Sequence, residues 1–131
     1  MKHTLRLLIP LILMIVACTT EQSDPQAPAQ AIEKYLTARI SKDSEAFVGT
    51  FCAAFELDAL TEFDSFGAVE ATIEDMTCTT DNISDGTANV TCSGSVTVVY
   101  DGEDNNTLDL GRFPYVAVQE DGAWKMCGYG S

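Results

Sequence analysis

Four cysteines in the body of this sequence have the residue type and spacing to form covalent cross-links. They are Cys52, Cys78, Cys92 and Cys127. Four thiolates can also hold zinc, but such sites usually contain closely spaced CxxC pairs, and this sequence has none. We therefore expect two disulfide bonds and no bound metal. An even set of cysteines is typical of a protein exported to an oxidising compartment, and three connectivities are open.

The residues around Cys78 and Cys92 favour one of these connectivities. Residues 76–99 contain a turn signal, Ser84-Asp85-Gly86, followed by alternating apolar and polar side chains, which is typical of a β-hairpin with a three-residue loop. Counting outward from the loop centre places the two cysteines opposite each other as a non-hydrogen-bonded pair, about 4.5 Å apart between Cα atoms. The register thus predicts a Cys78–Cys92 disulfide and leaves a Cys52–Cys127 disulfide by elimination.

The fifth cysteine, Cys18, follows a sequence typical of an export signal. Lys2 and Arg6 make the start basic, residues 7–17 are apolar but short for a bilayer span, and Ile15-Val16-Ala17 directly precedes the cysteine. This order resembles the lipobox of bacterial lipoproteins, in which the cysteine is lipidated and becomes the first residue of the mature protein. We predict a lipoprotein signal peptide at residues 1–17. The alternatives are an uncleaved anchor helix and an ordinary signal peptide.

A lipid on Cys18 would determine where the protein is found. Each buried methylene contributes about 0.8 kcal/mol, so two or three fatty-acid chains such as palmitate would hold the domain stably at a membrane surface. The resemblance implies a cell-envelope location, on the outer face of the cytoplasmic membrane or on an outer membrane where the source has one. Residues 18–27 are polar and lack periodicity, so we expect a flexible tether there.

Charge excludes one class of partner. The chain has 7 basic and 20 acidic side chains, and removal of the leader with Lys2 and Arg6 leaves five basic residues and a net charge of −15. Such a surface repels nucleic acid and anionic lipid. We therefore expect no nucleic-acid partner.

The sequence offers few groups for catalysis. Its single histidine, His3, leaves with the leader, so a Ser-His-Asp hydrolase is excluded. Acid–base chemistry would then need a desolvated carboxylate. The acidic turn at residues 101–106 lacks the glycine and glutamate of an EF-hand. We expect no cofactor, and we interpret the candidate carboxylates mainly as solvated; they are Glu56, Asp58, Glu62, Glu70, Glu74 and Asp75.

Apolar spacing predicts helices in the first half of the mature chain. The first helix covers residues 28–41, with an apolar stripe at helical spacing. The second covers residues 43–55, and Gly49 either bends or breaks it. A third covers residues 57–67. We therefore expect two to three N-terminal helices.

From Ala68 the apolar period changes to two, which predicts a meander of roughly four antiparallel strands. The alternation loses phase at Glu74-Asp75, where we place a bulge. Gly111 and Pro114 interrupt the third strand. Helices followed by antiparallel strands indicate an α+β fold in which the helices pack on a curved sheet.

Two segments carry a resemblance to a known superfamily. They are AIEKYLTARISKDSEAF at residues 31–47 and VQEDGAWKMCGY at residues 118–129. Together with the order of elements, they resemble the nuclear transport factor 2-like, cystatin-like cone superfamily, and most closely small bacterial lipoproteins of unknown function. The resemblance implies a domain at residues 28–131 with a conical pocket between the concave sheet and the helices.

Aromatic side chains are the candidates for lining such a pocket, although they also form ordinary cores. We name six of them: Tyr35, Phe51, Phe55, Tyr100, Tyr115 and Trp124. The leading hypothesis is a non-catalytic module that binds a small apolar ligand or an envelope protein through the cone or its rim. The alternatives are an isomerase or hydratase that uses a pocket carboxylate, and a structural envelope protein. A filled cone would argue against a ligand inside it.

Overall fold

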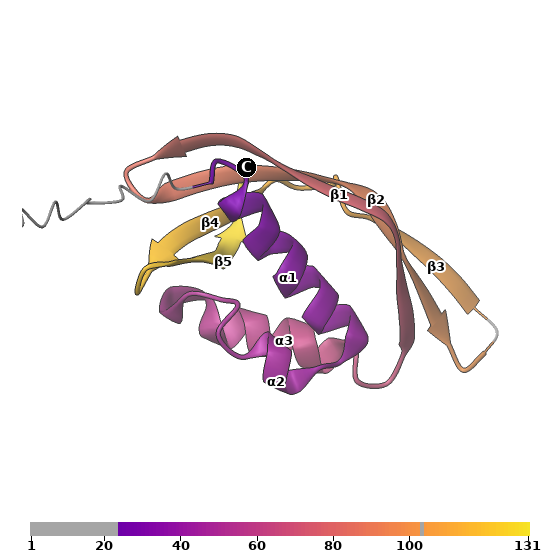
Figure 1. Ribbon diagram of the computed structural model, residues 1–131. Coiled ribbons are helices and arrows are strands. Elements are labelled where there is room, and N and C mark those ends of the chain that lie inside the picture. Colours follow the sequence, from indigo (N-terminus) through magenta and orange to yellow (C-terminus); the bar gives the residue numbers. More distant parts are fainter. Residues whose placement is uncertain (1–23, 103) are drawn as a thin grey trace, which may run out of the picture.

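The computed structural model describes residues 24–102 and 104–131. The predicted signal peptide, Cys18 and most of the predicted tether lie outside these residues. The described chain is α+β, with three α-helices and a short 3₁₀ helix packed against a five-stranded antiparallel sheet (Figure 1). The expected fold class is confirmed, and the sheet has one strand more than the four expected.

Helix α1, Ala27–Ser41, runs across the concave side of the sheet (Figure 1). Pro28 stands in its first turn, where a missing N–H costs no hydrogen bond. The helix ends at Lys42, which adopts the left-handed conformation with a φ of 57°. Ile32, Tyr35 and Leu36 are completely buried, so this helix supplies one side of the core.

The expected second helix is much shorter than residues 43–55. Helix α2 covers only Ser44–Phe47, and the Asp43 side chain caps it by accepting a bond from the backbone of Ala46 at 3.1 Å. The helical path ends at Val48, which has a ψ of 127°, and Gly49 follows with a φ of 89° that favours glycine. Helical structure resumes with the 3₁₀ helix η1, Ala53–Phe55, and with helix α3, Glu56–Ser65.

Strands β1, Glu70–Ser84, and β2, Thr87–Tyr100, form the predicted hairpin. The predicted three-residue loop is wrong, whereas the predicted cysteine pair is confirmed. The turn has two residues, Asp85 and Gly86, both with positive φ, as the Asp-Gly sequence favours. A register shift between Thr80 and Asn82 compensates for the missing loop residue, so Cys78 is still opposite Cys92. Their Cα atoms are 4.0 Å apart and a disulfide joins them.

A second register shift follows Glu74, where a bulge was predicted. Asp75 there has a φ of 52°. On β2, Gly94 faces this bulge so closely that an added Cβ would lie 2.6 Å from the Asp75 carbonyl oxygen. Only glycine fits at this contact, and the bulge bends the hairpin so that it curves around the helices (Figure 1).

The predicted third strand is two strands. Strand β3, Asp104–Asp109, pairs with the C-terminal half of β2, and strand β4, Tyr115–Glu120, pairs with its N-terminal end. Residues 110–114 connect them and contain the glycine and proline that predicted an interruption. Strand β5, Ala123–Tyr129, pairs with β4 and completes the sheet.

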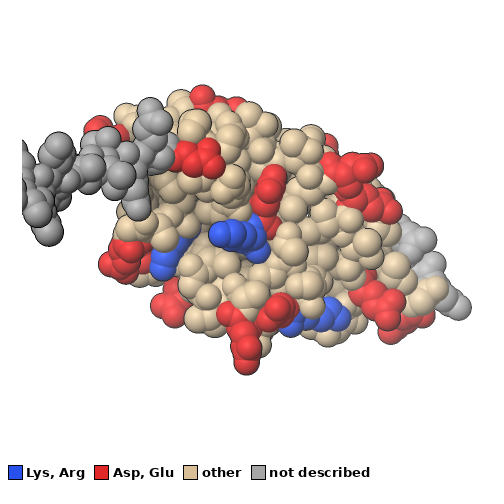
Figure 2. All heavy atoms as spheres, in the orientation of Figure 1, with Lys and Arg blue, Asp and Glu red and all other residues tan. Residues whose placement is uncertain are grey.

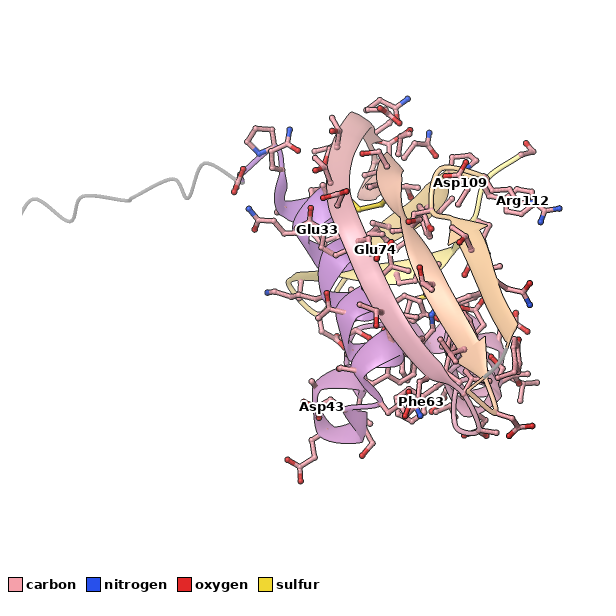
Figure 3. The ribbon with its side chains drawn as sticks, turned by 90° about the vertical axis from the view of Figure 1, so that its right-hand side faces the viewer. Glu33, Asp43, Phe63, Glu74, Asp109 and Arg112 are labelled. Atoms are coloured by element: carbon pink, nitrogen blue, oxygen red, sulfur yellow. A yellow bond between two sulfur atoms is a disulfide. The ribbon has the colours of Figure 1, made fainter. Side chains whose placement is uncertain are left out.

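Contacts from other elements reach two of the edge strands of the sheet, β1 and β5. On β1, the backbone N–H of Cys78 donates to Glu33 of α1 at 3.0 Å (Figure 3). This outward N–H agrees with a non-hydrogen-bonded cysteine pair. On β5, Met126 exchanges two 2.8 Å backbone bonds with residues 50–52, and a Cys52–Cys127 disulfide fixes that contact. Both disulfides are those that the sequence favours. The loop bonded to Met126 occupies part of the β5 edge, which limits strand addition there.

The space between the helices and the sheet is filled. The completely buried side chains include Ile32, Tyr35, Leu36, Phe47, Cys52, Val90 and Met126. Phe47 stacks on Phe63 of α3, with ring centroids 4.6 Å apart. None of the helices in the described part of the chain has the length and apolar character needed to span a bilayer.

Candidate functional site

The six aromatic residues named as pocket candidates do not line one cavity. Tyr35, Phe55 and Tyr115 are buried in the core, and Phe51 packs against it. Tyr100 is 48 % exposed near the end of β2. Trp124 lines a surface depression between β5 and the start of α1. The expected pocket lining is therefore wrong in this respect: most of these rings build the core that fills the cone.

A polar cluster lies at one end of this core, where α1, α3 and β5 meet. Its centre is Glu62, one of the predicted carboxylate candidates. Oxygen Oε2 of Glu62 accepts a bond from the Tyr35 hydroxyl at 2.7 Å and another from the Tyr129 hydroxyl at 2.9 Å. The same oxygen forms an ion pair with Nη1 of Arg39. Tyr35, Arg39 and Tyr129 are called the donor cluster below.

Arg39 is the only buried charged residue in the described chain, with 9 % of its surface exposed. Its guanidinium carbon lies 5.5 Å from the ring centroid of Tyr35 and 5.2 Å from that of Phe66, so aromatic faces enclose it. Nη1 also donates to the Tyr129 hydroxyl at 3.3 Å. The Nε atom is buried and has no hydrogen-bond partner among the described residues.

The protonation states of this cluster follow from burial and from its charges. Burial, reinforced by the bond to Glu62, raises the pKa of Tyr35 well above its usual range. Burial also raises the pKa of Tyr129, despite the opposing effect of Arg39. For Arg39, burial lowers the pKa, but attraction to Tyr129 and Glu62 outweighs it and the pKa is raised overall. Near neutral pH both tyrosines are therefore donors and the guanidinium stays charged.

A surface depression adjoins the cluster at Tyr129. It has a volume of about 450 Å³ and is lined by Phe113, Tyr129 and Gly130; it is called the Tyr129 depression below. The Tyr129 ring contacts the rings of Phe55, Phe113 and Tyr115, with centroid distances of 6.1, 6.5 and 5.4 Å. Its hydroxyl reaches Glu62. One side chain thus joins an exposed apolar wall to the buried polar cluster.

A larger hollow of about 590 Å³ runs along the outer side of α1, where Ala38, Ala46 and Met76 contribute apolar walls. Gln30, Lys34, Thr37 and Ser41 contribute polar walls. Its two carboxylates already have backbone partners, because Glu33 accepts from Cys78 and Asp43 caps α2. Figure 2 shows acidic side chains spread over the visible face and few basic ones, as a strongly acidic chain requires. We take the cluster and the Tyr129 depression as the candidate site, because there a buried charged side chain lies close to an exposed apolar wall.

The other predicted carboxylates are not brought into this site. Glu56, Asp58, Glu70, Glu74 and Asp75 are all exposed. Figure 3 shows Glu74 on the outer face of β1, away from the helices. Their interpretation as solvated groups agrees with these positions. No group of three metal-ligating side chains within the described residues is placed to hold a metal ion.

Comparison with solved structures identifies the architecture around this site. A candidate dehydratase of the NTF2-like family from Streptomyces avermitilis superposes with a TM-score of 0.55 over 86 % of this chain and 100 % of that chain. The fold is NTF2-like. Sequence identity is 11 %, so the likeness concerns the fold alone. The association domain of C. elegans CaMKII aligns with a TM-score of 0.44 and 19 % identity over 74 % of this chain and 85 % of that chain. Neither a protein-family model nor a curated protein matches the sequence.

The sequence-based expectations missed two members of the donor cluster. Arg39 follows Tyr35 by four residues and Ile32 by seven, so it lies on the buried face of the amphipathic helix. A charged residue at such a position is a signal, because buried charges need partners. Tyr129 stands between Gly128 and Gly130 at the end of the last strand, and nothing in the local sequence indicates that its hydroxyl turns toward α3.

Proposed function

We propose that this protein is a non-catalytic binding protein of the bacterial cell envelope, anchored through a lipid on Cys18, which holds a small apolar ligand in the Tyr129 depression. The observation that carries the proposal is the depression itself. Its volume of about 450 Å³ falls within the usual range for ligand pockets, roughly 300–1,000 Å³. Exposed Phe113 and half-exposed Tyr129 supply apolar walls next to a small number of fixed polar groups.

The filled cone favours a position on the rim of the fold for such a ligand. Completely buried side chains, among them Tyr35 and Phe47, occupy the space that an internal pocket would need. Opening an internal pocket would remove close packing in the core, and truncating one large core side chain lowers the unfolding free energy by about 2–5 kcal/mol. The rim remains available without this cost. The ligand is therefore proposed for the outer end of the cluster, at Phe113 and Tyr129.

The polar cluster supports binding more than catalysis. An isomerase or hydratase would use Glu62 as its base, because this carboxylate is half-buried near hydroxyl groups. However, Oε2 already accepts three hydrogen bonds from the donor cluster. The raised pKa values of Tyr35 and Tyr129 keep both hydroxyls protonated, so neither supplies a second base.

The outer face of the sheet argues against the structural-protein alternative. Its strands present hydroxyl groups in cross-strand pairs, with Thr79 opposite Thr91 and Thr72 opposite Thr97, which in turn is opposite Thr107. Assembly through a sheet face usually buries an apolar patch. A hydroxyl-rich face with exposed carboxylates such as Glu74 is instead typical of a solvated surface.

The envelope location is supported by the disulfides and by the sequence before the domain. Two disulfides in so small a domain agree with an oxidising compartment. Metabolic labelling with a radioactive fatty acid in a bacterial host tests the anchor. We expect label on the wild-type protein and none on Cys18→Ala, and label retained by that variant would contradict the anchor.

Ligand binding is tested with simple apolar probes. In a titration with 1-octanol and 4-methylphenol followed by ¹H–¹⁵N NMR, we expect saturable shifts at Phe113, Tyr129 and Gly130. Phe113→Ala should weaken binding about fivefold, because half of a phenylalanine's burial is worth about 1 kcal/mol. Tyr100→Ala is the matched control, since Tyr100 is an aromatic residue of similar exposure outside the depression. Equal effects of both substitutions, or shifts elsewhere, would refute this site.

A further inference from the structure

Three hydrogen-bond donors from two elements converge on one carboxylate oxygen. Tyr35 and Arg39 come from α1, one helical turn apart, and Tyr129 comes from β5. The acceptor is Oε2 of Glu62, which belongs to a third element, α3. Two hydroxyls and a guanidinium around one oxygen are the groups that recognise a carboxylate. In this structure a side chain of the protein itself fills that position.

We infer that the donor cluster is a carboxylate-binding site, and that the ligand of the Tyr129 depression is an amphiphilic monocarboxylate whose head group takes the place of Glu62. The inference rests on the proposed function and names its ligand class. The apolar tail lies against Phe113 and the Tyr129 ring, and the carboxylate reaches the donors beyond the Tyr129 hydroxyl. Tyr129 contacts both parts of the ligand.

Glu62 is the replaceable member of this cluster. Its side chain is 25 % exposed, whereas that of Arg39 is 11 % exposed, so Glu62 can turn outward to water more readily. It engages Arg39 through one oxygen and one nitrogen, although a guanidinium and a carboxylate can form two parallel bonds. The buried Nε of Arg39 is left without a partner among the described residues. A carboxylate that is not held by α3 can approach Arg39 in the two-bond geometry.

The exchange is balanced in charge. One carboxylate leaves the guanidinium and another arrives, so the buried charge of Arg39 stays compensated throughout.

The predicted net charge of −15 opposes the approach of any anion. At physiological ionic strength this repulsion is screened beyond about 8 Å, and it acts least on a ligand with one charge and a long apolar tail. These conditions favour a fatty or aryl-alkyl monoacid over a dicarboxylate or a phosphate.

The first experiment compares octanoate with octanamide on the wild-type protein by isothermal titration calorimetry. The two probes share a tail and differ in charge, so their affinity ratio isolates the head group. We expect octanoate to bind at least about tenfold tighter, and Arg39→Gln to abolish this preference. Octanamide binding as tightly as octanoate, at the same NMR-mapped depression, would overturn the inference and leave the proposed function standing. No binding of either probe would overturn both.

The second experiment asks whether a free carboxylate can replace Glu62. Glu62→Ala removes the internal carboxylate and leaves space beside the donors. Acetate or propionate at 100 mM should raise the melting temperature of this variant by at least about 4 °C, with no comparable effect on the wild type. Acetamide and sodium chloride are the matched controls, and equal stabilisation by either would contradict a carboxylate site. If Glu62→Ala does not fold, the octanoate comparison decides alone.

Discussion

The ion pair between Arg39 and Glu62 predicts an unequal response to the removal of its two partners. Glu62→Gln leaves Arg39, whose side chain is 11 % exposed, without a counter-charge. Arg39→Met leaves Glu62, whose side chain is 25 % exposed and which keeps its two tyrosine donors. An unpaired charge costs more where water reaches it less, so losing the carboxylate is the more damaging change.

The magnitudes follow from the exposed fractions. Breaking a fully buried pair costs about 3–5 kcal/mol, and the remaining access of Arg39 to water places Glu62→Gln near 3 kcal/mol. Arg39→Met should cost about 1.5 kcal/mol, because Glu62 keeps donors and methionine still fills the space between the rings. The double variant should lose about 3 kcal/mol, less than the two single losses combined, because each single change strands a partner that the double change removes.

Urea unfolding at neutral pH measures these differences, provided that the slope with denaturant is unchanged among the variants. Overall charge predicts the opposite order, because Glu62→Gln reduces the excess of negative charge and Arg39→Met increases it. A smaller loss for Glu62→Gln than for Arg39→Met would therefore refute the reasoning from local burial. Additive losses in the double variant would show that the two side chains do not act as a pair.

Three further predictions concern the fold. Replacing both cysteines of the Cys52–Cys127 disulfide by alanine should cost about 4.5 kcal/mol of unfolding free energy, and replacing those of Cys78–Cys92 about 3 kcal/mol. The costs differ because the two disulfides close loops of different length, with sequence separations of 75 and 14 residues. Denaturant unfolding measures both losses, and a larger loss for the shorter loop would contradict this account. Gly94→Ala should lower the melting temperature far more than Gly122→Ala. An added Cβ meets the backbone of Asp75 in the first case and open space in the second. Similar losses would show that the close approach of Gly94 to Asp75 is unimportant. Because the pKa of buried Tyr35 is raised, the unfolded chain loses this proton at a lower pH than the folded protein does. The unfolding free energy should therefore keep the full contribution of Tyr35 below about pH 10 and fall above it by up to about 1.4 kcal/mol per pH unit. Unfolding free energies that stay constant between pH 9 and 11 would contradict this.

Much of the fold follows from local patterns. The period-two alternation of β2 places Val90, Cys92 and Val96 on one face, and all three are buried. The loss of phase at Glu74 predicts the bulge, and the structure places a register shift there. The Cys78–Cys92 pair is predicted correctly although the expected loop is one residue too long. A register shift near Asp81 offsets this error, so that the two cysteines are still opposite each other. A local pattern cannot indicate such a compensation, which depends on how the whole hairpin packs.

The site follows much less from local patterns because it is made of contacts between distant residues. Glu62 was a candidate only as one acidic residue among six, and its partners lie 27, 23 and 67 residues away in the chain. The second helix was overextended for a similar reason. Phe51 continues the apolar spacing of a helix. However, residues 50–52 form backbone hydrogen bonds with the edge of β5, and these bonds outweigh the local preference for a helix.

The position of the proposed binding site is a consequence of how this domain is stabilised. A small domain must bury most of its large side chains, and here Tyr35, Phe47 and Phe55 fill the concavity that an NTF2-like fold provides. Because Arg39 is placed on the same buried face, it must be compensated, and Glu62 and Tyr129 provide the partners from the rim. Tyr129 is half-exposed, and its ring extends from this cluster toward Phe113. The requirement to neutralise one buried charge thus places an exposed aromatic wall next to buried hydrogen-bond donors, which is the arrangement that the proposed amphiphilic ligand needs.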